Sequence, residues 1–83
     1  MPATSTAPRL RDADKSQLLI LAAAMDEFAQ YGYAGGRVDR IAERAEINKR
    51  LIYYYFGNKD ELFLAVLERT YADIRAAEQA LHL

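Results

Sequence analysis

Apolar side chains recur at three- and four-residue intervals along most of this chain, and short polar runs that contain glycine separate these stretches. The first stretch predicts a helix that begins near Asp14, with Gln17 at capping-box spacing, and ends at Gly32. Its apolar stripe consists of Leu18, Leu21, Ala24, Met25 and Phe28. Residues 33–36 contain two glycines and are expected to form a loop.

Two short helical patterns follow, over residues 37–44 and 48–55, and a three-residue turn joins them. The small or apolar positions expected where these helices cross are Ile41, Ala42, Ala45, Ile47 and Ile52. Asn48 is a favourable N-cap residue for the second helix. This pattern is typical of a helix-turn-helix, in which a longer side chain at Ala42 would push the two helices apart.

A longer helix is predicted after Gly57, with Asn58 as its N-cap and Glu61 at capping-box spacing. Apolar positions recur in it as far as Ile74, and the pattern can continue to about residue 81. No strong alternating segment suggests a strand, and the chain is long enough for one small domain only. The sequence therefore predicts an all-α fold.

Residues 1–12 contain two prolines and no periodicity, and we expect them to form a disordered tail. Arg9 and Arg11 lie near its end. Two interpretations remain open for them: a solvated tail, or an arm that reaches phosphate or the minor groove of a nucleic acid.

Composition excludes several classes of function. The chain has no cysteine, which excludes disulfides and cysteine-based metal sites or nucleophiles. Its single histidine, His82, has no second ligand nearby, and no glycine-rich phosphate loop follows a strand, so we expect no enzyme activity, metal ion or cofactor. No stretch reaches the roughly 18 apolar residues that span a membrane, and no signal peptide is evident. We expect a soluble, cytoplasmic protein.

The charge is distributed unevenly along the chain, although the net charge is only −1. Residues 37–59 carry six basic and three acidic side chains, whereas residues 60–83 carry two basic and five acidic ones. The excess positive charge therefore coincides with the helix-turn-helix pattern. Because the local field matters more than the sum, this distribution favours an anionic partner such as DNA.

The second short helix carries cationic and phenolic side chains that folding alone does not explain. Lys49 and Arg50 lie in its first turn, where the helix dipole disfavours positive charge by about several tenths of a kcal/mol. In a helix inserted into the major groove, this end meets the bases, and Arg or Lys can bond guanine. Of Tyr53, Tyr54 and Tyr55, one or two should face outward; the alternative is that all three cover a small core.

Cations also stand at the start of two other predicted helices. Lys59 begins the fourth helix and Arg37 opens the second, and both could grip backbone phosphates on either side of a groove. Arg40 and Arg44 are open to two interpretations: DNA contact, or surface pairing with Glu43 or Asp39.

From about residue 18 to residue 66 the chain resembles the DNA-binding domain of the TetR family of bacterial transcriptional regulators. The matching strings are ILAAAMDEFAQYGY, VDRIAERAEI and NKRLIYYYFGNKDELFLAV. The string YYYFGNKDEL is close to the most specific signature of the family. The resemblance implies a homeodomain-like three-helix unit with a fourth helix that leads into a C-terminal domain, which in the family dimerises and binds a small-molecule inducer. Most members are repressors.

The resemblance also assigns expected roles to single residues. Lys49 and Arg50 match positions that touch bases or phosphates, and Tyr53 and Tyr54 match aromatic positions at the groove wall. Phosphate-contacting positions match Tyr55, Lys59 and Arg37.

Three departures from the family pattern concern the second helix and its turn. Arg37 replaces a usual Ser or Thr, and Gly36 stands where a threonine N-cap is common, which predicts fraying. Glu46 stands where a glycine with positive φ is usual, at an expected cost of about 1 kcal/mol.

We therefore predict a TetR-like regulator that binds duplex DNA through residues 48–55. Specificity is expected to come mainly from Lys49, Arg50, Tyr53 and Tyr54, with Leu51 available for a thymine methyl. The DNA-binding domain is expected over residues 13–75, with its motif at about 37–56. Residues 76–83 are expected to end the fourth helix before an absent ligand-binding and dimerisation domain, so that dimerisation is weak or absent. The alternative is a helical protein-interaction module that pairs through Leu64, Leu67, Tyr71 and Ile74.

Overall fold

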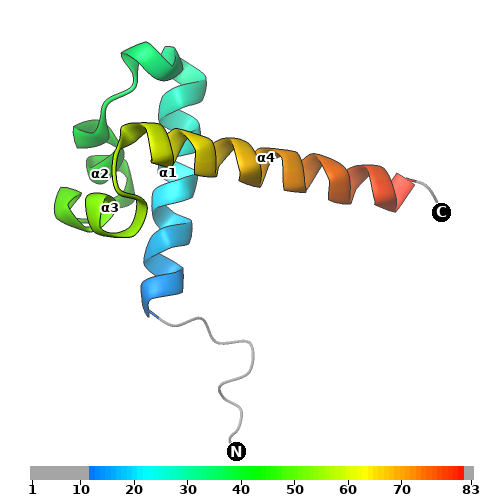
Figure 1. Cartoon of the computed structure of the whole chain (residues 1–83), viewed down its shortest axis with the longest axis horizontal. Helices are drawn as coiled ribbons and strands as arrows, with labels where there is room; N and C mark the ends of the chain where they lie inside the picture. The colour runs from blue at the N-terminus through cyan, green and yellow to red at the C-terminus, as the bar shows by residue number, and fades with distance from the viewer. Residues whose placement is uncertain (1–11, 82–83) are drawn as a thin grey trace, which may run out of the picture.

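The computed structural model describes residues 12–81, which form four α-helices and no strand (Figure 1). The helices are α1 (Asp12–Gly35), α2 (Val38–Ala45), α3 (Lys49–Phe56) and α4 (Lys59–Leu81). Their number, order and type confirm the predicted all-α fold. The predicted tail up to residue 11, with Arg9 and Arg11, and His82 lie outside the described residues.

The helix α1 is the central element, since it contacts all three other helices. Figure 1 shows α2 and α3 side by side next to α1, while α4 crosses α1 and its second half extends away from the other helices. All residues from 71 to 81 are exposed, which agrees with this overhang. The helices α1, α2 and α3 thus form one body with the first half of α4, and the second half of α4 projects from it.

The two ends of α1 differ from the prediction. Asp14 lies within the helix, which already includes Asp12, so Asp14 is not its N-cap. The helical geometry is interrupted at Gly32, with φ 74° and ψ 176°, as the predicted end there implied. Residues 33–35 then form a further helical turn instead of a loop, because the amide of Gly36 bonds the carbonyl of Gly32 at 3.0 Å.

The buried face of α1 is also displaced from the predicted stripe. Ala24 and Phe28 are buried as predicted, but Leu18 is 37% exposed and Leu21 and Met25 are only partly buried. The remaining buried positions of α1 are Ile20, Ala23 and Glu27. The displacement arises because α1 packs against α2 on one side and α4 on another, so that no single stripe describes its contacts.

The helix-turn-helix crossing agrees with the sequence pattern. Ile41, Ala42, Ala45 and Ile52 are buried, and Ile47 is partly buried against them. The two predicted asparagine caps are confirmed. The Oδ1 of Asn48 accepts from the amide of Arg50 at 2.7 Å, and that of Asn58 accepts from the amide of Glu61 at 2.8 Å.

Gly36 serves packing rather than capping, contrary to the prediction. The N-cap of α2 is Arg37, in an extended conformation and without a side-chain cap. A Cβ on Gly36 would lie 2.6 Å from Cδ1 of Phe28, which is closer than real Cβ contacts. A glycine is therefore needed here because the backbone passes directly over an aromatic ring of the core.

Glu46 adopts the left-handed conformation expected at this position, where glycine is usual, with φ 57° and ψ 50°. We expect Glu46→Gly to raise the free energy of unfolding by about 1 kcal/mol, because glycine has no Cβ to clash in this region. Urea denaturation monitored by circular dichroism measures the change.

Glu43→Gly is the matched control, since it makes the same substitution at a right-handed helical position of α2. It should lower the free energy of unfolding by about 0.5 to 1 kcal/mol. A loss of stability in both variants would contradict the strain at Glu46.

Candidate nucleic-acid interface

The helix α3 presents a divided surface. Ile52 is 1% exposed and anchors the helix in the core, whereas Tyr53 and Tyr54 are 44% and 78% exposed. Arg50 is also exposed, and Leu51 is partly exposed. Tyr55 is half-buried against the core, so the prediction that one or two of the three tyrosines face outward is confirmed.

Two of the predicted DNA-contacting cations meet one carboxylate. The Nζ of Lys49 lies 2.7 Å from Oδ1 of Asp39, and Nη2 of Arg37 lies 3.4 Å from Oδ2 of the same residue. Asp39 on α2 therefore joins the start of α2 to the start of α3. All three side chains are about half exposed or more, at 52% for Asp39, 51% for Lys49 and 63% for Arg37.

These ion pairs shift two protonation equilibria. The hydrogen bond and charge of Lys49, with a further hydrogen bond from Arg37, lower the pKa of Asp39. The hydrogen bond to Asp39 and its charge raise the pKa of Lys49. Both groups therefore stay ionised at neutral pH, and the cluster has a net positive charge.

Arg40 and Arg44 pair with a residue that the sequence analysis did not single out. Their Nε atoms donate to Oε2 and Oε1 of Glu27, at 2.6 and 3.0 Å. The amide of Arg37 donates to Oε2 as well, at 3.0 Å. Two interpretations were open for these arginines, and the pairing with Glu43 or Asp39 is not found among the described residues, because α1 brings another carboxylate to the same helix face.

Glu27 is a buried carboxylate, with no exposed surface. Burial alone would raise its pKa, but the hydrogen bonds from Arg40, the Arg37 amide and Arg44 outweigh burial and lower the pKa below its ordinary value of 4.5. The sequence held a signal for this site: a glutamate between apolar positions of α1 and two arginines spaced four apart on α2. That spacing places both guanidinium groups on one face of a helix.

Lys59 stands at the start of α4 and lies against an aromatic ring. Its Nζ is 4.5 Å from the ring centroid of Tyr33, whose hydroxyl donates to the carboxylate of Asp60. The same ring packs edge-on against Phe63, at 5.1 Å between centroids. Lys59 is partly exposed, so an ammonium group held over a ring is still able to meet a phosphate.

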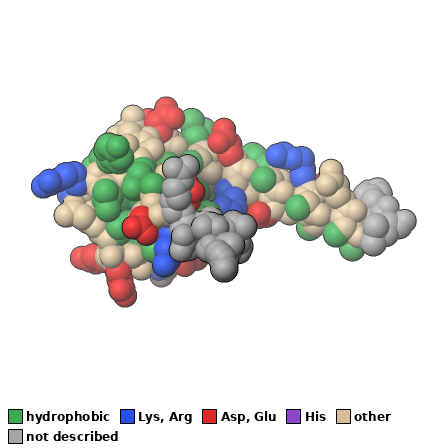
Figure 2. Space-filling model, turned by 90° about the horizontal axis from the view of Figure 1, so that it is seen from below, with side chains coloured by type: hydrophobic (Ala, Val, Ile, Leu, Met, Phe, Trp, Pro, Cys, Tyr) green, Lys and Arg blue, Asp and Glu red, His purple; other side chains and the backbone are tan. Residues whose placement is uncertain are grey.

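Figure 2 shows that acidic and basic side chains alternate over the face it views, without one broad basic field. A cation instead stands at the start of each of α2, α3 and α4, and acidic residues accompany it in the first turns of α2 and α4. Such a surface suits a limited set of defined contacts better than sequence-independent attraction alone.

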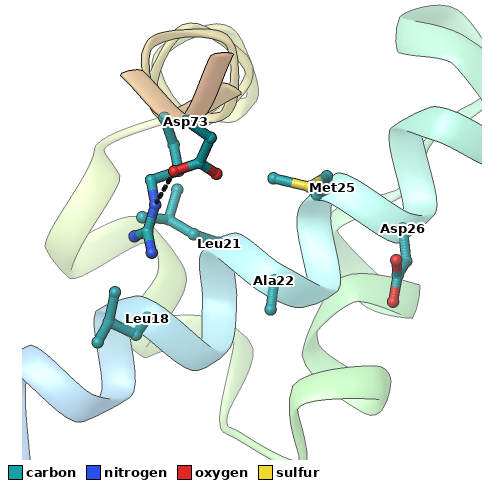
Figure 3. Close-up of a pocket in the computed structure, with 7 residues that line it drawn as sticks. Leu18, Leu21, Ala22, Met25, Asp26 and Asp73 are labelled. Carbon is teal, nitrogen blue, oxygen red and sulfur yellow. Dashed lines mark ion pairs between the residues drawn. The ribbon is translucent and has the colours of Figure 1, made fainter. Parts of the chain in front are cut away.

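A separate concave region lies between α1 and α4 (Figure 3). Its volume is about 300 Å³, and the ion pair between Arg69 and Asp73 lies beside Leu21 and Met25. This region does not include the exposed cations of α3. Within residues 12–81 we find neither a cluster of potential metal ligands nor a helix apolar and long enough to cross a membrane.

Comparison with known proteins identifies the family. The family model for bacterial regulatory proteins of the tetR family matches residues 20–66, which include the end of α1, α2, α3 and the start of α4. The chain belongs to the tetR family. This membership confirms the predicted resemblance and the prediction of an N-terminal DNA-binding domain of a transcriptional regulator.

Similar proteins carry names that agree with the family. The chain is 43% identical over its full length to the HTH-type transcriptional repressor NicS of Pseudomonas putida, of which it covers 39%. Over 77% of its length it is 52% identical to the HTH-type transcriptional repressor SCO4008 of Streptomyces coelicolor, of which it covers 33%. The chain therefore spans well under half the length of these relatives.

A solved structure supports the fold. The crystal structure of a HlyIIR mutant protein matches 71% of this chain with a TM-score of 0.69 and 30% sequence identity, and the match covers 33% of that protein. None of these comparisons assigns a role to a single side chain, so the DNA-contacting residues of this tetR-family chain remain predictions.

Proposed function

We propose that this tetR-family domain binds duplex DNA with α3 in the major groove and that it belongs to a transcriptional repressor. One observation supports the proposal above the others: α3 buries Ile52 and exposes Arg50, Tyr53 and Tyr54 together. A helix held by one face and polar on the other is what groove insertion requires.

Base contacts are proposed for the exposed part of α3. Arg50 forms no ion pair with any other residue in the range 12–81, so its guanidinium group can bond O6 and N7 of a guanine. Lys49 is a second donor once it leaves Asp39. Leu51 is available for a thymine methyl, and Tyr53 and Tyr54 can lay their rings against the sugar or the methyl at the groove wall.

Backbone contacts are proposed for the residues that flank α3. Arg37 at the start of α2 and Lys59 at the start of α4 provide cations on either side of the inserted helix. Tyr55 is half-buried, and its hydroxyl is the group assigned to phosphate. These contacts would set the position of the domain without reading sequence.

The rest of the proposal concerns the whole protein. Residues 13–75 would act as the DNA-binding unit, in a homodimer that presents two copies of α3 to half-sites one or two helical turns apart. Dimerisation and the binding of a small-molecule inducer would depend on a further domain after α4. We place the protein in the cytoplasm at the nucleoid, without enzyme activity or a cofactor of its own.

Fluorescence anisotropy of the chain with a mixed-sequence duplex, from low to moderate salt, tests DNA binding. We expect a dissociation constant of roughly 10⁻⁴ to 10⁻⁶ M and a linear fall of log K with log salt, because phosphate contacts release counterions. No change of anisotropy even at low salt would contradict DNA binding by this chain alone.

A second candidate function is association through α4. Leu64, Tyr71 and Ile74 are 51%, 56% and 49% exposed, and Leu67 is partly buried. An apolar face of this kind on a projecting helix favours pairing with another helix. Concentration-dependent sedimentation that Ile74→Asp abolishes and Arg50→Ala leaves unchanged, together with flat anisotropy, would favour this candidate over DNA binding.

A further inference from the structure

Asp39 occupies a position that the proposed DNA contacts do not explain. Each of its two carboxylate oxygens holds a different cation, Lys49 at 2.7 Å and Arg37 at 3.4 Å. These are two of the cations to which we assign DNA contacts, and they come from different helices. A carboxylate at an interface with a polyanion needs a reason, since it repels phosphate.

A phosphate must displace Asp39 before it can bind Lys49 or Arg37, and this limits what the two cations contribute to DNA binding. A phosphate that approaches either cation replaces one charge-assisted hydrogen bond with another, so the net gain is smaller than for a free cation. The same phosphate also meets the negative charge of Asp39 at close range. Contacts with any backbone, whatever its sequence, are therefore weakened at both positions.

A specific site changes this balance. Aspartate can accept a hydrogen bond from the N4 amino group of cytosine in the major groove, whereas the O6 of guanine and the O4 of thymine would repel it. At a sequence that presents an amino group to Asp39, the carboxylate thus gains a contact that a random sequence does not offer.

On the basis of the proposed function, we infer that Asp39 determines the specificity of DNA binding. It restrains Lys49 and Arg37 in the free protein, and it thereby weakens binding to DNA of arbitrary sequence. The restraint is local and does not depend on net charge alone. It predicts that removal of this carboxylate strengthens sequence-independent binding more than removal of another carboxylate on α2 does.

Glu43 provides the matched control for this prediction. It lies on the same helix, is exposed, and forms no ion pair within the described part of the chain. Asp39→Asn and Glu43→Gln each remove one negative charge and keep the shape of the side chain. Only the first releases Lys49 and Arg37.

The test measures the anisotropy of a mixed-sequence duplex with the wild type and both variants over a range of salt concentrations. For Asp39→Asn we expect affinity to rise by about threefold to tenfold at low salt and the salt slope to steepen by about one. Glu43→Gln should change affinity by less than about twofold and leave the slope unchanged. For a duplex selected by the wild type, Asp39→Asn should gain less affinity than it gains for mixed sequence.

Three results would overturn the inference. Equal effects of the two variants would show that Asp39 acts only through net charge. Weaker binding by Asp39→Asn would show that Asp39 is needed for DNA binding of any sequence. In both cases the wild type still binds, and the proposed function stands. Flat anisotropy for the wild type and both variants would instead overturn the proposed function, and this inference with it.

Discussion

Glu27→Ala is expected to lower the free energy of unfolding of this domain by about 3 kcal/mol, since it removes the buried partner of two arginines and one amide. Breaking a buried ion pair costs about 3 to 5 kcal/mol. The lower figure applies because the side chains of Arg40 and Arg44 are 37% and 33% exposed and can regain water. Urea denaturation at neutral pH measures the loss.

The size of this loss matters for function. A domain of this length has a total stability of about 4 to 12 kcal/mol, so a large part of it depends on one carboxylate. Glu27 also ties α2 to α1, and α2 in turn carries the turn before α3. We therefore expect Glu27→Ala to weaken DNA binding indirectly, through a loosened helix-turn-helix.

Gln30→Ala is the matched control for Glu27→Ala. Gln30 accepts from Nη2 of Arg44 at 2.9 Å, but it is exposed, so its loss should change the free energy of unfolding by less than about 0.5 kcal/mol. Similar losses for the two variants would show that burial of Glu27 is not the source of its effect.

The same contact makes the stability depend on pH in acid. The pKa of Glu27 is lower in the folded state than its ordinary value of 4.5. Its contribution is therefore complete above about pH 4.5 and is lost as the pH falls through the folded-state pKa. In this range the free energy of unfolding of Glu27→Gln should fall less steeply with decreasing pH than that of the wild type. The pKa of Asp39 is also lowered, and its titration adds the same pH dependence to both proteins.

Arg50→Ala is expected to reduce discrimination between DNA sequences by about 1 to 3 kcal/mol at one position of the selected duplex. The reason is that Arg50 is exposed on α3 and has no competing carboxylate within the described residues. Competition of single-base variants against the selected duplex measures this change, with the wild type as the reference.

Lys59→Ala provides the contrast, because Lys59 lies at the start of α4 and is assigned to the backbone. We expect it to weaken binding to all duplexes by one common factor and to reduce the salt slope by about one. A common factor for Arg50→Ala as well would remove Arg50 from the residues that read bases.

Local sequence signals predicted most of the helical framework. The sequence placed the start of α3 at Asn48, its end at Gly57 and the start of α4 at Asn58, and the structure has these caps. Such ends can be predicted because capping depends on neighbours within three residues. The sequence predicted that one or two of the three tyrosines of α3 face outward, and the structure identifies Tyr53 and Tyr54 as these residues, with Ile52 buried. Angles within one helix need no tertiary information.

The errors arose where two elements meet. The stripe on α1 was displaced because its buried face includes Glu27, which meets two arginines of α2. A periodicity of apolar residues cannot indicate a buried position that is charged. Gly36 was interpreted as a poor cap, whereas the ring of Phe28 on α1 leaves no room for a Cβ at this position. Both depend on a distance between segments that a pattern along the chain does not contain.

The sequence by itself determined the four helices, their order, the helix-turn-helix motif and membership of the tetR family, because these rest on spacing and on residue types within short segments. Only the tertiary structure decided which charges neutralise one another. It brings Glu27 to the two arginines of α2, and it brings Asp39 to Lys49 across ten residues of chain. Ion pairs form over a few ångströms in space, so the packing of helices, and not their sequence, decides which cations remain free for DNA.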